Sequence, residues 1–188
     1  PAFVTISPSA SKGGPRNYSN AFLPSIHQGT ALGLAGNVSG AKIKNIDNAM
    51  LSDAQRENRY DLLQNLNRFQ AGSSGDDNLE ATIANYELAW RMQMEAPELT
   101  DLSKETAATK SIYGIDEKYT DDFGKQCLLA RRMVERGVRF VSVNYSDESA
   151  NPRWDQHGNM PKHADHARAT DKPVAGLLQD LKMRGLLE

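Results

Sequence analysis

Two side chains suited to metal binding, Asp155 and His157, follow the strongest strand signal in the sequence. That signal is the run Val138–Tyr145, which is rich in β-branched and aromatic residues. If Trp154–His157 is extended, the alternation of a strand places Asp155 and His157 on the same side. A carboxylate and an imidazole placed in this way can bind one divalent metal. Ligands of open α/β sheets lie just beyond the carboxyl ends of the strands, so this pair is the candidate metal site.

The same residues also allow a plainer interpretation. An Asp-x-His spacing fits an ordinary Asx turn with a solvent-facing histidine. The spacing alone favours that turn slightly, and the position of the pair beyond a strand makes the metal site about equally well supported. A catalytic metal needs about three protein ligands, so Asp155 and His157 are at most part of a site. His163 and His166 could share one helix face, although an exposed polar turn is favoured for them. An unrelated metal-binding module would need both of these histidines to complete a closed site.

The residues alone assign no nucleophile. No Gly-x-Ser-x-Gly motif occurs, and Cys127 lies on the apolar stripe of a predicted helix, which favours a small core residue. The loop Ser7–Pro15 is not a P-loop, because it lacks the Gly-Lys-Ser/Thr ending. Its glycines would let backbone approach a ligand, although a surface turn is favoured. The reaction is therefore undetermined from these residues alone.

The elements that must position the candidate pair belong to an α/β pattern. A helix marked by Phe123, Cys127, Ala130 and Val134 precedes the strand 138–145, with Gly137 ending it and arginines in its last turns matching the helix dipole. A final helix is predicted to be capped by Thr170 or Asp171, with Pro173 in its first turn and Gly185 at its end. This order predicts parallel strands joined by right-handed crossovers.

The first half of the chain contains a short strand, an irregular segment and a pair of helices. Residues 2–7 are the predicted strand, and residues 15–50 show little periodicity, with Gly29, Gly33, Gly36 and Gly40 along them. The pair of helices spans 52–96. It opens with a capping box at Ser52–Gln55, and Leu62, Leu66 and Phe69 form an apolar stripe that is expected to face the core. The second helix is predicted from Asp77 to Glu95, with an apolar face at Leu79, Ile83, Tyr86, Trp90 and Met94, and Pro97 is expected to stop it.

Composition excludes several classes of protein. The chain has 188 residues and a net charge of −2, and no basic cluster is interleaved with aromatics, so a nucleic-acid partner is not expected. No apolar run is long enough to span a membrane, and one cysteine cannot build an internal disulfide framework. The sequence begins inside a strand pattern and stops just past a helix, so we expect residues 1–188 to be an internal segment of a single domain with both flanks missing.

Several motifs together resemble a known family. They are CLLARRMVERGVRFV at 127–141, WDQH at 154–157, DLKMRGLL at 180–187, PAFV at 1–4, FLP at 22–24, QGT at 28–30 and YELAWRMQ at 86–93. Over essentially all 188 residues the chain resembles the bacterial domain of unknown function 1501, a member of the alkaline-phosphatase/sulfatase-like superfamily. The resemblance implies part of an α/β/α sandwich with a mostly parallel sheet and several helices.

The resemblance also implies a function. Superfamily phosphatases and sulfatases hydrolyse phosphate or sulfate esters with a metal site of Asp and His ligands, so Asp155 and His157 are the expected ligands of a divalent metal such as zinc or calcium, with His163 in reserve. The resemblance implies a superfamily nucleophile upstream of Pro1, and the family's Glu-Phe-Gly-Arg-Thr-Pro stretch is expected after Glu188, so this segment alone is expected to be inactive. Family members commonly carry an export signal, which implies a periplasmic or surface location. The alternative is a non-catalytic exported surface or binding protein that keeps the fold.

Overall fold

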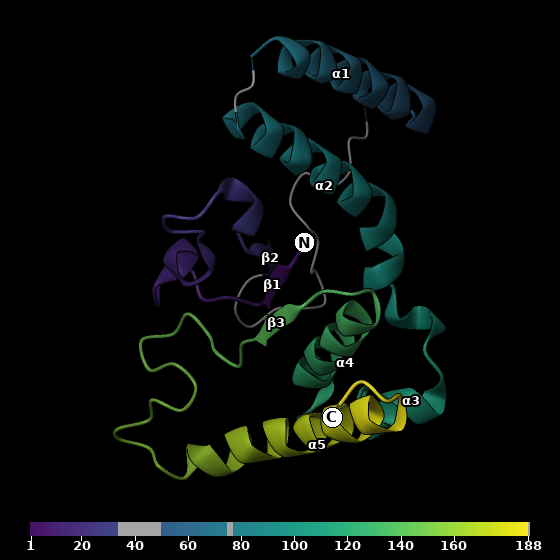
Figure 1. Ribbon diagram of the computed structural model, residues 1–188. Coiled ribbons are helices and arrows are strands. Elements are labelled where there is room, and N and C mark those ends of the chain that lie inside the picture. Colours follow the sequence, from purple (N-terminus) through teal and green to yellow (C-terminus); the bar gives the residue numbers. More distant parts are fainter. Residues whose placement is uncertain (34–49, 75–76, 188) are drawn as a thin grey trace.

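The structure is a computed structural model that describes residues 1–33, 50–74 and 77–187 (Figure 1). Its described elements are β1 (Phe3–Ile6), η1 (Gly14–Tyr18), η2 (Ser25–His27), β2 (Thr30–Leu32), α1 (Asp53–Ser74), α2 (Asp77–Thr100), η3 (Leu102–Lys104), α3 (Ala107–Ile112), α4 (Asp121–Glu135), β3 (Phe140–Val143) and α5 (Lys162–Met183). The mixture of helices with a small sheet confirms the α/β class. Of the predicted irregular segment 15–50, residues 34–49, which include Gly36 and Gly40, lie outside the described residues. Among the described helices, none contains an apolar stretch of the length that a membrane span requires.

The three described strands form one parallel sheet in the order β2-β1-β3. Val4 of β1 pairs with Thr30 of β2 on one side and with Val141 of β3 on the other. Beyond the last rung, Asn144 Nδ2 donates hydrogen bonds to Thr5 Oγ1 and to the Ile6 carbonyl, both at 2.9 Å. The predicted parallel arrangement is confirmed. The loops that follow β1 and β3 therefore leave the sheet at the same edge.

Helix α4 is the central layer of the fold, between the sheet and α5 (Figure 1). On one side Leu129, Ala130 and Met133 pack against Val4, Ile6 and Leu32 of the sheet. A second apolar cluster is formed by Tyr113, Ile115, Phe123, Cys127 and Leu128, and Leu177 of α5 packs against it. Burying both faces of α4 explains why its sequence carries such a broad apolar stripe. Gly137 has the positive φ of a helix-ending glycine, as predicted.

Cys127 is a buried core residue, as its place on the apolar stripe predicted. Its side chain is 1% exposed and burial raises the pKa of its thiol to about 12. Because the thiolate is the reactive form, we expect no reaction with a disulfide reagent such as DTNB in the native chain at pH 8. One thiol per chain should react once urea unfolds the protein. Stoichiometric labelling of the native chain within minutes would contradict this placement.

Helix α1 begins with the predicted capping box, but the face that it packs against the rest of the protein is not the predicted one. Ser52 N donates to Gln55 Oε1 at 2.9 Å, and Gln55 N donates to Ser52 Oγ at 3.3 Å. The expected core stripe is wrong, however, because Leu62, Leu66 and Phe69 are 60%, 55% and 82% exposed. Helix α1 packs on α2. The side of α1 that faces α2 is the one that carries Tyr60, which stacks on Trp90 with the ring centroids 4.7 Å apart.

Helix α2 continues past the predicted stop at Pro97. It ends at Thr100 and is drawn as a bent helix in Figure 1. Proline removes one backbone donor and usually kinks or ends a helix. Here the residues after Pro97 are held by α4, since Arg132 Nη2 donates to the Glu98 carbonyl at 2.7 Å and Leu99 packs against the sheet core. Tertiary contacts therefore outweigh the local stop signal. Of the predicted α2 face, Tyr86 and Met94 are exposed, which corrects that part of the prediction.

Helix α5 starts earlier than its capping signals predicted. It begins at Lys162, so Pro173 lies in its interior and is fully buried. Thr170, a predicted cap, instead donates its hydroxyl hydrogen bond to the His166 carbonyl at 3.0 Å. The exposed polar turn expected around His163 and His166 is thus the start of a long helix. Gly185 has a positive φ past the helix end, as predicted.

Candidate functional site

Asp155 and His157 lie in turns on the loop that follows β3, and their side chains meet. The Nε2 atom of His157 contacts the Oδ1 atom of Asp155 directly. The segment is not extended: Asp155 N donates to the Pro152 carbonyl at 2.9 Å, and Trp154 has a φ of +72°. The expected convergence is present, but turns produce it and not strand alternation. The two side chains are 52% and 85% exposed, so both are open to solvent.

His163 and His166 project from the first turns of α5 toward Trp154. The ring centroids of Trp154 lie 5.8 Å from His163 and 5.4 Å from His166. The Nε2 atom of His163 is 3.3 Å from the Trp154 carbonyl oxygen, and Tyr145 Oη is 3.2 Å from His166 Nδ1. We call Tyr145, Trp154, His163 and His166 the aromatic cluster. It fixes the loop that carries Asp155 against α5.

The surroundings of His166 disfavour its protonated form. Burial lowers the pKa of His166 first, and the positive charges of Arg153 and Lys162 and the His163 ring lower it further, against an opposing effect of Asp147. The Nε2 atom of His166 is buried and has no hydrogen-bond partner. Arg153 itself lies over the ring of Tyr145, with its Cζ 4.4 Å from the centroid. A neutral imidazole with one free nitrogen is therefore packed beside the Asp155 loop.

The donor types at this edge suit a divalent metal, but the set is incomplete. Asp155 supplies a carboxylate oxygen and His157 an imidazole nitrogen, both ordinary metal ligands. Among the residues that the structure describes, no group of three or more His, Cys, Asp or Glu side chains is arranged to hold a metal. The closed site that would need His163 and His166 is not formed by the described residues. The assignment of Asp155 and His157 as two ligands stays a prediction.

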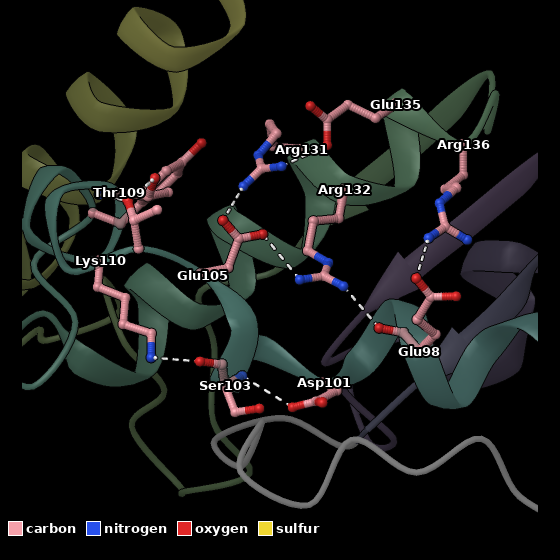
Figure 2. Close-up of polar contacts among 12 residues, drawn as sticks. Glu98, Asp101, Ser103, Glu105, Thr109, Lys110, Arg131, Arg132, Glu135 and Arg136 are labelled. Carbon is pink, nitrogen blue, oxygen red and sulfur yellow. Dashed lines mark hydrogen bonds and ion pairs between the residues drawn. The ribbon is translucent and has the colours of Figure 1, made fainter.

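A second polar cluster, which the sequence did not predict, lies where arginines of α4 meet Glu105, just before α3 (Figure 2). Arg131 is 3% exposed, and its guanidinium meets Glu105 Oε2 at 2.9 Å and Asp180 Oδ2 at 3.1 Å, with Glu135 as a third partner. We call this the arginine network. Its members are Glu105, Arg131, Arg132, Glu135, Asp180 and Arg184.

The arginine network joins three helical segments. Glu105 precedes α3, Arg131 lies in α4, and Asp180 lies in α5 and accepts a 2.8 Å hydrogen bond from Tyr113 Oη. Burial opposes ionisation of Asp180, but hydrogen bonds from Arg184 and Tyr113 and the nearby arginine charges hold its pKa below the usual range. The sequence did contain one signal, because Arg131 lies four residues after Cys127 and hence on the buried stripe. The network has a structural role: it fixes α5, and with it the aromatic cluster, on α4.

Comparison with known proteins places the whole chain in one family. A family model described as a protein of unknown function, DUF1501, matches residues 1–188. The chain belongs to the DUF1501 family. Searches of curated proteins and of solved structures give no match to it. Because the match spans the full length, the Asp155 loop, the aromatic cluster and the arginine network all lie within the DUF1501 domain.

Proposed function

We propose that this DUF1501 chain is part of a metal-dependent hydrolase of phosphate or sulfate esters with a fold of the alkaline-phosphatase type. The observation that supports this most directly is the meeting of Asp155 and His157 beyond the carboxyl end of β3. Ligand sites of parallel α/β sheets lie at that edge. The parallel sheet and the resemblance to sulfatase-like proteins support the same proposal.

In this proposal each side chain has a defined task. Asp155 and His157 hold two coordination positions of a divalent ion, and His163 is the reserve ligand. When bound, such an ion supplies charge neutralisation for the transferring group and lowers the pKa of the attacking group. The contacts of Trp154 with His163 and His166 keep the ligand loop against α5. The substrate of the proposed hydrolase is an anionic phosphate or sulfate ester.

The remaining ligands and the nucleophile are proposed to come from other parts of a longer protein. The absence of a third metal-binding partner among the described residues fits that division. It equally fits the alternative, a non-catalytic exported surface or binding protein that retains the fold. The family resemblance supports placing the parent protein in the periplasm or at the cell surface in either case.

Metal titration tests the ligand assignment. We expect zinc, added to the chain in isothermal titration calorimetry, to bind with an affinity that falls at least about tenfold in Asp155→Ala and in His157→Ala. The matched control is His27→Ala, because His27 is an exposed histidine on η2, far along the chain from the β3 loop. Zinc binding that is equal in all four proteins would remove both residues from the site.

Turnover then separates the two functions. The full-length protein with zinc, calcium or manganese should hydrolyse an aryl phosphate or an aryl sulfate, and Asp155→Ala should abolish that hydrolysis. The 188-residue chain alone should show none. If the full-length protein binds metal through Asp155 but hydrolyses neither ester, the non-catalytic alternative is the better description.

A further inference from the structure

The loop after β1 binds a carboxylate that belongs to the loop after β3. Glu148 lies on the segment after β3, and its Oε1 atom accepts a 2.7 Å hydrogen bond from Ala10 N. Its Oε2 atom accepts a 3.1 Å hydrogen bond from Ser11 N and a further hydrogen bond from the Ser11 hydroxyl. Two successive backbone N–H groups and a hydroxyl thus converge on one anion, an arrangement that binds anions in many proteins.

The charge at this position is stabilised by hydrogen bonds and not by burial. Glu148 is an exposed residue, yet the pKa of its carboxyl is lowered to about 2. The causes are led by the hydrogen bonds from Ser11 and Ala10, and the Ser9 hydroxyl adds to them. Because these donors act on a carboxylate in contact with water, the loop itself favours a negative charge.

The loop also has internal bonds that shape it without Glu148. Lys12 N donates to Ser9 Oγ at 2.9 Å, and Asn17 Nδ2 donates to the Lys12 carbonyl at 2.8 Å. Ser9 is 8% exposed, so the base of the loop is packed. A loop that is already ordered loses little conformational entropy when a ligand exchanges for Glu148. The donors of Ala10 and Ser11 are therefore available in the same arrangement to another anion.

We propose that Ser9–Ser11 is a binding site for a tetrahedral oxyanion, phosphate or sulfate, and that Glu148 is its internal occupant. The proposal rests on the proposed function for the identity of the ligand, since it assigns the oxygens of the ester's anionic group to this loop. The sites for metal and for oxyanion then lie on the two loops that leave the same edge of the sheet. Binding of the oxyanion releases Glu148 and with it the start of the loop that carries Asp155 and His157.

Removing the internal occupant tests the site directly. Amide chemical shifts of Ala10 and Ser11 are followed by NMR while sodium sulfate or sodium phosphate is added at constant ionic strength, with a chelator present. We expect Glu148→Ala to bind either anion at least about tenfold more tightly than the wild-type chain, because the competing carboxylate is gone. Adding Ser11→Ala to that variant should lower its affinity for the anion about tenfold, because a hydrogen bond to a charged group is lost.

The control separates a local effect from a general loss of negative charge. Glu117→Ala removes an exposed glutamate that pairs with Lys172 elsewhere on the surface. Equal gains in Glu117→Ala and Glu148→Ala would overturn the proposal, as would a gain that is insensitive to Ser11→Ala. Because the chelator removes metal, this result is independent of Asp155 and His157. Anion binding without zinc binding would reject the metal ligands alone, and zinc binding without anion binding would reject this loop alone.

Discussion

An Arg131→Ala variant is expected to lose about 3–5 kcal/mol of unfolding free energy, because it removes one partner from buried ion pairs. The side chains of Arg131, Glu105 and Asp180 are 4%, 12% and 5% exposed. Without the guanidinium, these carboxylates keep their burial and lose their central cation. Arg132 and Arg184 continue to pair with Glu105 and Asp180, so the loss should stay within this range and not exceed it.

Urea unfolding followed by circular dichroism measures this loss. The matched control is Arg168→Ala, which removes the same type of side chain from a surface position away from the ends of α5. Arg168 is 63% exposed, and its partner Asp165 is 55% exposed, so that pair should contribute no more than about 1 kcal/mol. A loss in Arg131→Ala that is no larger than in Arg168→Ala would show that the arginine network behaves like a surface ion pair.

The elements that sequence patterns predicted well are those determined by neighbouring residues. The capping box at Ser52–Gln55 was correct because both of its hydrogen bonds join residues three apart. Gly137 ends α4 as predicted, because the positive φ required there is a property of the residue itself. The parallel sheet followed from the order of helix and strand, since a helical crossover returns the chain to the same edge.

The predictions that failed depend on partners far away in the chain. The stripe of Leu62, Leu66 and Phe69 indicated an apolar face, but the stack of Tyr60 on Trp90 decides which side of α1 meets α2. The less exposed face of α1 instead carries Tyr60, Leu63, Gln64 and Asn67. Pro97 failed as a stop for a similar reason, because contacts with α4 hold the last turn of α2.

The sequence predicted that Asp155 and His157 would meet, but not the backbone turns that bring them together or the side chains packed beside them. The edge of the sheet was identified from the strand before it, and Asp155 does meet His157 there. Strand alternation was the wrong reason, because turns around Pro152 and Trp154 bring the two together. The packing of His163 and His166 on Trp154 could not be predicted, since it depends on where α5 begins. Helix α5 begins before its local caps because its interior is buried against α3 and α4.

Two glycines allow this close packing of helices, and a methyl group at either should be costly. A Cβ at Gly124 of α4 would lie 2.3 Å from the Tyr113 carbonyl oxygen, and a Cβ at Gly176 of α5 would lie 2.5 Å from the Ile112 carbonyl oxygen. Both contacts are with backbone at the end of α3, which cannot rotate away. Tyr113 is itself fully buried and bonded to Asp180, so its movement would strain the arginine network.

We therefore expect Gly124→Ala to lower the unfolding free energy by about 1–3 kcal/mol, the usual cost of overpacking. Alanine favours a helix over glycine by about 1 kcal/mol, so a site with free space would instead gain stability. The opposite signs of these two effects make the measurement decisive. Gly158→Ala is the control, because a Cβ there meets nothing within 4 Å, and its unfolding free energy should change by less than about 0.5 kcal/mol. A Gly124→Ala variant that is more stable than the wild-type chain would mean that α3 and α4 are not in the close contact described.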